Sequence, residues 1–332
     1  MTVWSETTLL GIYTLTPTHF GTGQTTGAVD LPIARDASTG FPVLPATGIK
    51  GVLRDYAGNA RNADGKTLLD PVEVNCLFGK NLDEGGERDK AETLEVGRLA
   101  FTEARLIAYP ARSLTRPFLH VTCPLILERL ARDLRAVDRP ELLQGWEAPE
   151  PEGATALVAD SELVGPLVLE DLIYLPDEVA HSRAMEDLAT RLSVLLPSGE
   201  EDTRKRLIKG LVLIPDEHFL CLMESGVPVQ ARIKLTGGKT TDKWFNPETK
   251  KEESGNLWYE EYLPPDCLFL ALVGERRQRV SPHADRRSCD RYGLETLAKV
   301  AQELGVVQIG GNETVGQGLC YCVLHRAGEE TQ

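Results

Sequence analysis

The chain has 332 residues, of which 42% are hydrophobic, and this is enough for one large core or two smaller ones. The formal net charge of −14 at pH 7 excludes a uniformly basic nucleic-acid binder. The N-terminus "MTVWSETTLLGIYTLTP" has no basic start and no long apolar run, and no apolar stretch of about eighteen residues follows. We therefore expect a cytoplasmic protein without a signal peptide or a membrane partner.

Strands and helices are predicted to follow one another irregularly. Residues 7–15 are rich in β-branched and apolar side chains and predict a strand, and residues 16–32 predict a loop. Apolar residues at helical spacing over 46–60 predict a helix with Thr47 as its N-cap. By the same criteria we expect a hairpin over 33–45, strands over 97–113, 227–235 and 256–273, helices over 123–134, 182–197 and 293–304, a helix leading into a strand over 204–215, and two strands joined by a glycine-rich loop over 305–324.

This order lacks the regular alternation of strand and helix that builds a parallel sheet. We therefore expect an α+β fold with antiparallel sheets covered by helices. Residues 79–95 are charged and poor in apolar side chains, and they predict a mobile insertion. Residues 139–153, rich in proline and acids, predict a linker or loop, and residues 236–255 predict a protruding hairpin.

The seven cysteines are an odd number and include no CxxC pair. Cys320 and Cys322 would lie on one face of a strand, but no second close pair of cysteine or histidine completes a zinc site. We expect reduced, mostly buried thiols.

The first glycine-rich loop, "GTGQTTGAVDLP" at 21–32, fits neither common nucleotide-binding motif. Its third glycine comes one position too late for a dinucleotide fingerprint, and Pro32 follows where a helix should begin. The Gly-Lys-Thr at 238–240 has Ile233 in place of the first P-loop glycine. On the residues alone, Asp30 in this loop is a turn-forming or capping aspartate before a strand.

The second glycine-rich loop, "GGNETVGQG" at 310–318, has four glycines in nine residues. Such a loop lets backbone N–H groups approach an anion closely. Its spacing fits a tight hairpin or β-bulge between two strands equally well.

Both loops contribute to a resemblance that covers about residues 8–323. The N-terminal run "LTPTHFGTGQTTGAVDLPIARDASTGFPVLPATGIKGVLR" resembles the opening of the RAMP proteins of CRISPR systems, and "GGNETVGQG" resembles their glycine-rich loop. The combination of "HFGTG", Asp-Leu-Pro and "TGFPVLPATGIKG" is similar to one subfamily, the Cas-seven type backbone subunit of type III-B (Cmr) effector complexes. The stretches "LFG", "PARSL" and "GNLWYEEYLPPD" match the same pattern in order.

The resemblance implies a single RAMP domain over 1–332, with a ferredoxin-like (RRM-like) palm and a β-hairpin thumb inserted at 236–256. It implies that copies stack along CRISPR guide RNA beside other Cmr-complex subunits, and that each copy cuts the complementary single-stranded target RNA once. In this family the cleaving residue is an aspartate in the first glycine-rich loop, followed by Leu-Pro, which is Asp30 here. The reaction uses a divalent metal, usually Mg²⁺, and Asp30 would be the metal ligand.

The chemistry is consistent with that implied role, because the 2′-hydroxyl of RNA is already a nucleophile. One carboxylate with hydrated Mg²⁺ can neutralise the phosphate and help to move a proton. His19 matches the histidine of the family's "HxGTG", either as a proton carrier or as a hydrogen-bond donor to RNA, and a backbone-bonded loop histidine is an equal alternative. Glu260 or Glu261 could assist at the base of the thumb, or could be an ordinary strand residue.

Guide contacts should go mainly to phosphate and sugar, because a backbone subunit must accept any guide sequence. Lys50 and Arg54 lie four residues apart on one helix face and match basic positions of the family motif. Further expected RNA contacts are the glycines Gly310, Gly311, Gly316 and Gly318, the thumb residues Lys239, Lys243, Trp244 and Phe245, and the secondary candidates Arg112, Arg116, Arg276 and Arg277.

The net charge opposes RNA binding on steering grounds, so we expect basic inner surfaces and an acidic exterior. Two alternative functions stay open at this point. One is a filament subunit that binds guide RNA without cutting, and the other is a stand-alone guide-processing ribonuclease. The Asp30 motif favours cutting over the first, and the absence of a histidine cluster in the sequence argues against the second.

Overall fold

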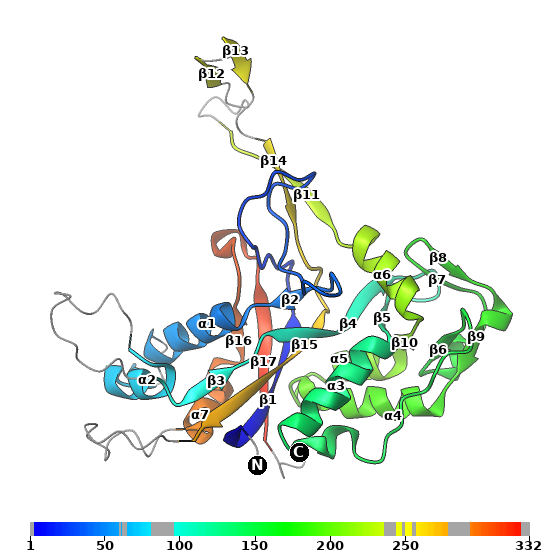
Figure 1. The fold of residues 1–332 in the computed structure, drawn as a ribbon, viewed down its shortest axis with the longest axis horizontal. Helices are drawn as coiled ribbons and strands as arrows, with labels where there is room; N and C mark the ends of the chain where they lie inside the picture. The colour runs from blue at the N-terminus through cyan, green and yellow to red at the C-terminus, as the bar shows by residue number, and fades with distance from the viewer. Residues whose placement is uncertain are drawn as a thin grey trace.

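The computed structural model describes residues 3–59, 61, 65–80, 96–235, 244–247, 250–253, 257–277 and 293–326. These residues form a mixed α+β fold, which confirms the predicted class. One large sheet runs through the molecule, with helices packed on it and a narrow ribbon projecting from it (Figure 1).

The centre of the large sheet is antiparallel. Strand β1 (Trp4–Thr14) pairs with β15 (Leu268–Arg276) on one side and with β17 (Leu319–His325) on the other. Beyond these, β16 (Val306–Gln308) pairs with β17, and β4 (Ala104–Arg112) pairs with β15. Two short strands, β2 (Val43–Leu44) and β3 (Leu99–Phe101), add to β4 and β15 respectively.

The sheet continues from β4 through β5 (Phe118–Thr122), β10 (Leu211–Leu213), β6 (Ala156–Val158) and β9 (Val179–His181). Here β10 runs parallel to β5, and β6 runs parallel to β9. The expectation of a purely antiparallel sheet is therefore wrong for this part. A separate hairpin, β7 (Leu167–Leu169) with β8 (Leu172–Tyr174), lies beside it.

The helices are α1 (Ala46–Asn59), α2 (Pro71–Phe78), α3 (Pro124–Ala136), α4 (Arg183–Leu192), α5 (Glu201–Gly210), α6 (Asp216–Ser225) and α7 (Leu294–Leu304). Helix α1 begins at Ala46, so Thr47 lies inside it and is not the predicted N-cap. Asp70 caps α2 with bonds from the N–H groups of Val72 and Glu73, and Glu73 bonds back to complete a capping box.

The core is continuous beneath the sheet, and β1 lies at its centre. Leu9, Leu10 and Ile12 of this strand are fully buried. Gly11 lets the short helical turn Ser193–Leu195 pack directly on the strand, because a Cβ there would collide with the carbonyl oxygen of Leu195. The predicted strand 7–15 is thus the central element of the fold.

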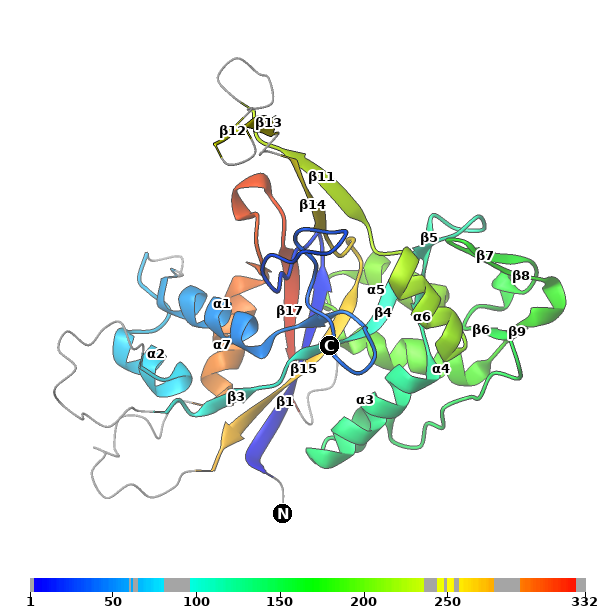
Figure 2. The same cartoon turned by 45° about the horizontal axis from the view of Figure 1, so that its top comes forward.

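The projecting ribbon consists of β11 (Val229–Ile233) and β14 (Leu257–Glu261), which pair antiparallel. It leads away from the body to a second pair, β12 (Trp244–Asn246) and β13 (Lys251–Glu253) (Figures 1 and 2). This is the position of the predicted thumb. Lys239 and Lys243 lie outside the described residues, as do the side chains of Trp244 and Phe245 and the predicted insertion from residue 81 onward.

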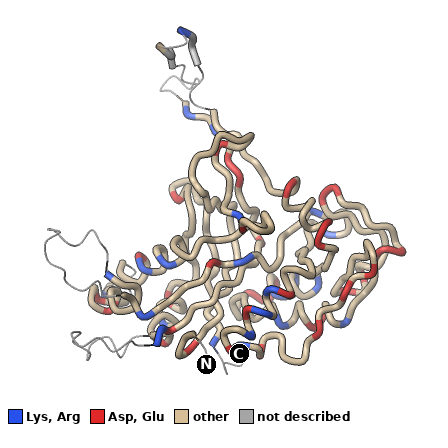
Figure 3. Tube along the Cα trace, in the orientation of Figure 1, with Lys and Arg blue, Asp and Glu red and all other residues tan. Residues whose placement is uncertain are grey.

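Charge is unevenly distributed (Figure 3). Residues 138–225, which span β6–β9 and α4–α6, hold 19 Asp and Glu against 7 Lys and Arg, and therefore carry −12 of the net −14. The rest of the chain, including α1, the central strands and the ribbon, is close to neutral. Among the described residues no helix is long and apolar enough to cross a membrane.

Five cysteines are free in the structure, and four of them, Cys123, Cys267, Cys320 and Cys322, are buried. Cys221 is exposed. Cys76 is disulfide-bonded, so the expectation of reduced thiols is wrong at this position.

Candidate functional site

The first glycine-rich loop is fastened to the base of the ribbon. Leu31 donates its N–H to Tyr259 O (3.0 Å) and accepts from Glu261 N (3.0 Å), so it adds a short parallel rung to β14. Upstream, Thr18 exchanges two backbone bonds with Leu263 (2.9 and 2.8 Å). The loop is therefore held at both ends by one stretch of chain, residues 259–263.

Asp30 lies half-buried at this junction. Its Oδ2 accepts the N–H of Tyr259 (2.8 Å), and its carbonyl accepts the N–H of Thr25 (2.9 Å). Among the described residues no donor engages Oδ1. The carboxylate is thus fixed by one oxygen, while the other remains available to a ligand.

His19 is 8% exposed and lies between the two glycine-rich loops. Its Nδ1 is 2.6 Å from the carbonyl oxygen of Glu261, so Nδ1 carries a proton, and in the neutral ring Nε2 is then the acceptor. Nε2 faces Gly21, where a Cβ would collide with the ring. The carbonyl oxygen of His19 accepts the N–H of Gly311 (2.9 Å), which joins the two loops directly.

Glu260 does not face solvent, since the residue is only 4% exposed. Its Oε2 lies 2.7 Å from Nε of Arg232, and its Oε1 accepts from Nδ2 of Asn312 (2.6 Å) and lies 3.6 Å from Nδ1 of His19. Such a buried, paired carboxylate is suited to positioning other groups. Glu260 lies in β14 at the base of the ribbon, beside His19, where the sequence suggested either an assisting carboxylate or an ordinary strand residue.

Glu261 is occupied differently. Its Oε2 accepts the N–H of Ile33 (3.1 Å), and its Oε1 pairs with Arg35 (3.3 Å). Glu261 therefore fixes the segment that follows Asp30 and is not free for chemistry.

The second glycine-rich loop folds as a tight connection between β16 and β17, with a single helical turn at Glu313–Val315. Gly310 and Gly318 have φ of +95° and +82°, and a Cβ at either would collide with backbone, at His19 and Ile309 respectively. Gly310, Gly311 and Gly316 are exposed, so their backbone is open to a ligand, whereas Gly318 is buried. A glycine is needed at 318 because the chain packs tightly against Ile309 there, and this explains the residue without the predicted contact with RNA.

Lys50, Arg54 and Arg276 are brought together by the fold. Partial burial lowers the pKa of Lys50, and the positive charges of Arg54 and Arg276 lower it further. Arg54 bonds to Gly79 O and to Asn75 Oδ1, and Arg276 bonds to Gly97 O (3.1 Å). Among the described residues none of these three cations has a carboxylate partner, so the cluster is suited to an anion.

Arg112 and Arg116 are engaged elsewhere. Arg112 pairs with Glu170 through its side chain (2.5 Å), and Arg116 pairs with Asp160 (2.7 Å). These pairs join the β4–β5 hairpin to the acidic part of the chain. Arg112 keeps an exposed guanidinium, whereas the polar atoms of Arg116 serve the fold.

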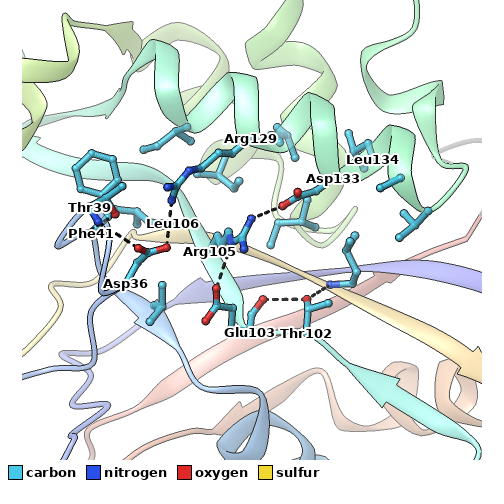
Figure 4. Close-up of a pocket in the computed structure, with 18 of the residues that line it drawn as sticks. Asp36, Thr39, Phe41, Thr102, Glu103, Arg105, Leu106, Arg129, Asp133 and Leu134 are labelled. Carbon is cyan, nitrogen blue, oxygen red and sulfur yellow. Dashed lines mark hydrogen bonds and ion pairs between the residues drawn. The ribbon is translucent and has the colours of Figure 1, made fainter. Parts of the chain in front are cut away.

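A pocket of about 250 Å³ lies apart from these groups, between α3 and the sheet (Figure 4). Its floor is apolar, and ion pairs cross its rim, among them Asp36 with Arg129 (3.1 Å) and Arg105 with Asp133. Burial alone would raise the pKa of Asp36, but hydrogen bonds from Ser38 and Thr39 and the charge of Arg129 lower it to about 2. None of the predicted site residues lines this pocket.

No group of three or more His, Cys, Asp or Glu that could hold a metal occurs in the described part of the chain. The donor set at Asp30 still suits Mg²⁺, which commonly takes one or two protein carboxylates and completes its shell with water and phosphate. It does not suit zinc, which takes three or four protein ligands.

Comparison with known proteins identifies the family, because the model of the RAMP superfamily matches residues 11–321. The chain belongs to the RAMP superfamily. This RAMP protein is 33% identical over 313 residues to the CRISPR system Cmr endoribonuclease Cmr4 of Pyrococcus furiosus, covering 93% of this chain and 92% of the relative. The resemblance to backbone subunits of Cmr complexes is thereby confirmed.

Solved structures agree with this assignment. Oligomeric Cmr4 from Pyrococcus furiosus superposes with a TM-score of 0.63 at 26% identity, covering 97% of this RAMP protein and 98% of that chain. A chain of the type III-B Cmr-beta complex bound to cognate target RNA has a TM-score of 0.62 at 17% identity, covering 97% and 98%. The second likeness shows the shared fold alone.

The site also contains residues that sequence reasoning missed. Asn312 and the backbone of Tyr259 each hydrogen-bond to a predicted site residue, and Arg232 forms an ion pair with one. No spacing rule marks them, because they meet only when β11, β14 and the C-terminal loop are folded together. The one available sign was Asn312 itself, the amide inside the glycine-rich run.

Proposed function

We propose that this protein is the repeated backbone subunit of a type III-B CRISPR RNA-guided complex, and that it binds guide RNA and cleaves the complementary target RNA at regular intervals. The observation that carries the proposal is the Asp30 carboxylate, anchored by one oxygen to the base of the projecting ribbon and open at the other. The 33% identity to an endoribonuclease over nearly the whole chain supports the same reading. The proposed partners place the protein in the cytoplasm.

The cutting chemistry needs little from the protein beyond geometry. The anchored loop holds Asp30 at the scissile phosphate. The 2′-hydroxyl of the target RNA attacks the phosphorus while the P–O5′ bond breaks, which leaves a 2′,3′-cyclic phosphate and a 5′-oxygen that takes up a proton to become a hydroxyl. In the neutral form of His19, Nε2 can accept a proton from the 2′-hydroxyl or a hydrogen bond from RNA. A divalent ion such as Mg²⁺, held by Asp30, would supply charge neutralisation at the phosphate.

A ferredoxin-like palm is supported by the strand order. Strands β17, β1, β15 and β4 lie side by side, and along the chain they are the fourth, first, third and second of this set. Helix α1 falls between the first two and α7 between the last two. This is the β-α-β-β-α-β connectivity of that fold, with β5–β10 and the ribbon as additions.

Guide binding is proposed at the cluster of Lys50, Arg54 and Arg276 and at the exposed backbone of Gly310, Gly311 and Gly316. Contacts to phosphate through point charges and N–H groups accept any guide sequence. Lys239, Lys243 and Trp244 of the thumb, and the exposed Arg112, remain further proposed contacts with RNA. Neighbouring copies of this chain and other Cmr subunits would complete the assembly.

A guide-binding subunit that does not cut is the second candidate. It accounts for the basic cluster but not for the 33% identity to an endoribonuclease over nearly the whole chain. Target cleavage by the assembled complex, measured on labelled RNA with and without EDTA, separates the two. Asp30→Asn is the sharpest variant, because an amide oxygen still accepts the Tyr259 N–H while the charge is lost. Cleavage that depends on EDTA-sensitive metal and is lost in Asp30→Asn supports our proposal, and wild-type cutting by Asp30→Asn excludes it.

A further inference from the structure

The buried carboxylate of Glu260 joins three parts of the chain. Arg232 reaches it from β11, His19 from the first glycine-rich loop and Asn312 from the second. A carboxylate at 4% exposure is costly to bury unless its lone pairs are satisfied, so each partner matters for the position of the others. This buried charge lies beside the loop that carries Asp30, which we call the cutting loop.

Asn312 is held in an uncommon conformation to make its contact. Its φ is +64°, in the left-handed region that asparagine and glycine tolerate best. Its Nδ2 donates both to Oε1 of Glu260 (2.6 Å) and to Oε1 of Gln317 (3.0 Å), which is 9% exposed. Both amide hydrogens are therefore used, and the side chain can only point inward.

The same loop is bonded to the cutting loop along the backbone. Gly311 N–H donates to His19 O, and Gly310 packs against that carbonyl with no room for a side chain. His19 in turn bonds to Glu261 O, two residues along β14 from the N–H that holds Asp30. A displacement of the Gly310–Gly318 loop would thus be transmitted to both His19 and Glu260.

We propose that Asn312 is a positioning residue, which locks the guide-facing loop to Glu260 and thereby sets the geometry of His19 and Asp30. This rests on the proposed function and adds a residue to it. Asn312 does not itself touch the target RNA. Its bond to Glu260 ties the strand that anchors Asp30 to the Gly310–Gly318 loop, which is the loop proposed to receive the guide.

Two variants test the link in the assembled complex. Asn312→Gly keeps the left-handed backbone and removes the bond to Glu260. Asn312→Asp keeps the shape but places a carboxylate against Glu260, so that one of the two acids must be protonated for the contact to form. Glu303→Ala, at an exposed position of α7 outside the loop, is the control and should cut at the wild-type rate.

We expect guide affinity to stay within about threefold, while single-turnover cleavage falls about 10- to 100-fold in both variants at neutral pH, because small displacements at a reacting centre have effects of this size. Asn312→Asp should recover relative to wild type as the pH falls from 8 to 5.5, whereas Asn312→Gly should not. His19, Arg232 and Glu261 also lie near Glu260 and residue 312, and their own charges can change with pH. The cleavage rate of each variant is therefore divided by the wild-type rate at the same pH.

Wild-type cleavage by both variants, or equal pH profiles for the two, would overturn the role of Asn312. Equal losses of guide affinity and cleavage would also contradict it, because they indicate a loop that has simply unfolded. If the wild-type complex itself fails to cut target RNA, the proposed function fails instead, so the two failures can be told apart.

Discussion

At the scale of single residues, the site contains two carboxylates in different surroundings. Asp30 and Glu260 are both acids near the ribbon, but one keeps an oxygen open and the other is buried among Arg232, Asn312 and His19. The Asp30 motif could be recognised from the sequence. The difference between the two acids could not, because it depends on contacts between residues far apart in the chain, 229 positions for Asp30 with Tyr259 and 52 for Glu260 with Asn312.

A buried histidine away from the site gives a prediction at this scale. Burial beside the rings of Tyr13 and Phe118 lowers the pKa of His120 to about 4, below the ordinary value of 6.5. Between pH 6.5 and 4, His120 therefore binds a proton in the unfolded chain but not in the folded chain. The free energy of unfolding falls as the pH falls through this range. We expect this group to contribute a loss of about 2 kcal/mol between pH 7.5 and pH 5.

Chemical denaturation at the two pH values measures this effect. His120→Leu removes the titrating group from an apolar site, and it should show a smaller loss of unfolding free energy than wild type by about that amount. The same pH dependence in both proteins would rule His120 out as its source.

At the scale of elements, the spacing of apolar residues predicted the longer strands and helices. Strand β1, helices α1, α3, α4 and α7, and the strand–loop–strand at the C-terminus lie where the pattern placed them. Helix α2 was missed because its 8 residues give few repeats of an apolar face, and α6 was missed because its apolar residues 219–223 are consecutive and show no helical spacing. The parallel pairings of β5 with β10 and of β6 with β9 were missed, because the sequence around one strand does not show which distant strand it pairs with.

Helix α1 carries an element-scale prediction. Gly51 is exposed in this helix, and a Cβ there would meet no other atom within 4 Å. Gly51→Ala should therefore stabilise the fold by about 0.5–1 kcal/mol. It follows Lys50 directly, so a guide backbone seated on this helix would meet the new methyl group. We expect a higher melting temperature together with weaker guide binding. A more stable variant with unchanged guide affinity would place the guide elsewhere.

Gly318→Ala is the comparison with opposite sign. Its φ of +82° and its contact with Ile309 leave no room for a methyl group, so it should lower the melting temperature. Thermal unfolding of the two variants side by side checks both expectations, and a neutral Gly318→Ala would show that β16 and β17 tolerate a different connection.

At the scale of the whole molecule, the acidic charge and the proposed RNA surface are separate. The acidic part, residues 138–225, is joined to the rest by ion pairs such as Arg116 with Asp160. The cluster of Lys50, Arg54 and Arg276 has no carboxylate partner among the described residues. The acidic segment can be counted from the sequence, but the meeting of Lys50, Arg54 and Arg276 becomes clear only in the fold.

This separation predicts how salt affects binding. Lys50→Glu should weaken guide binding for every guide sequence and reduce the slope of log affinity against log salt by about 1, because one phosphate contact is lost. Glu147→Gln, within the acidic part, should leave the slope unchanged. Binding titrations at several salt concentrations with two unrelated guides check this, and a defect confined to one guide would argue against a phosphate contact.

The central claim is that Asp30 cuts target RNA once per copy of this chain. The most direct measurement is the ladder of products from labelled target RNA, made by complexes assembled from mixtures of wild-type and Asp30→Ala chains. We predict that guide and target stay bound, that every regularly spaced cut weakens in proportion to the Asp30→Ala fraction, and that no cut changes position. A full ladder from complexes containing only Asp30→Ala chains would contradict the claim.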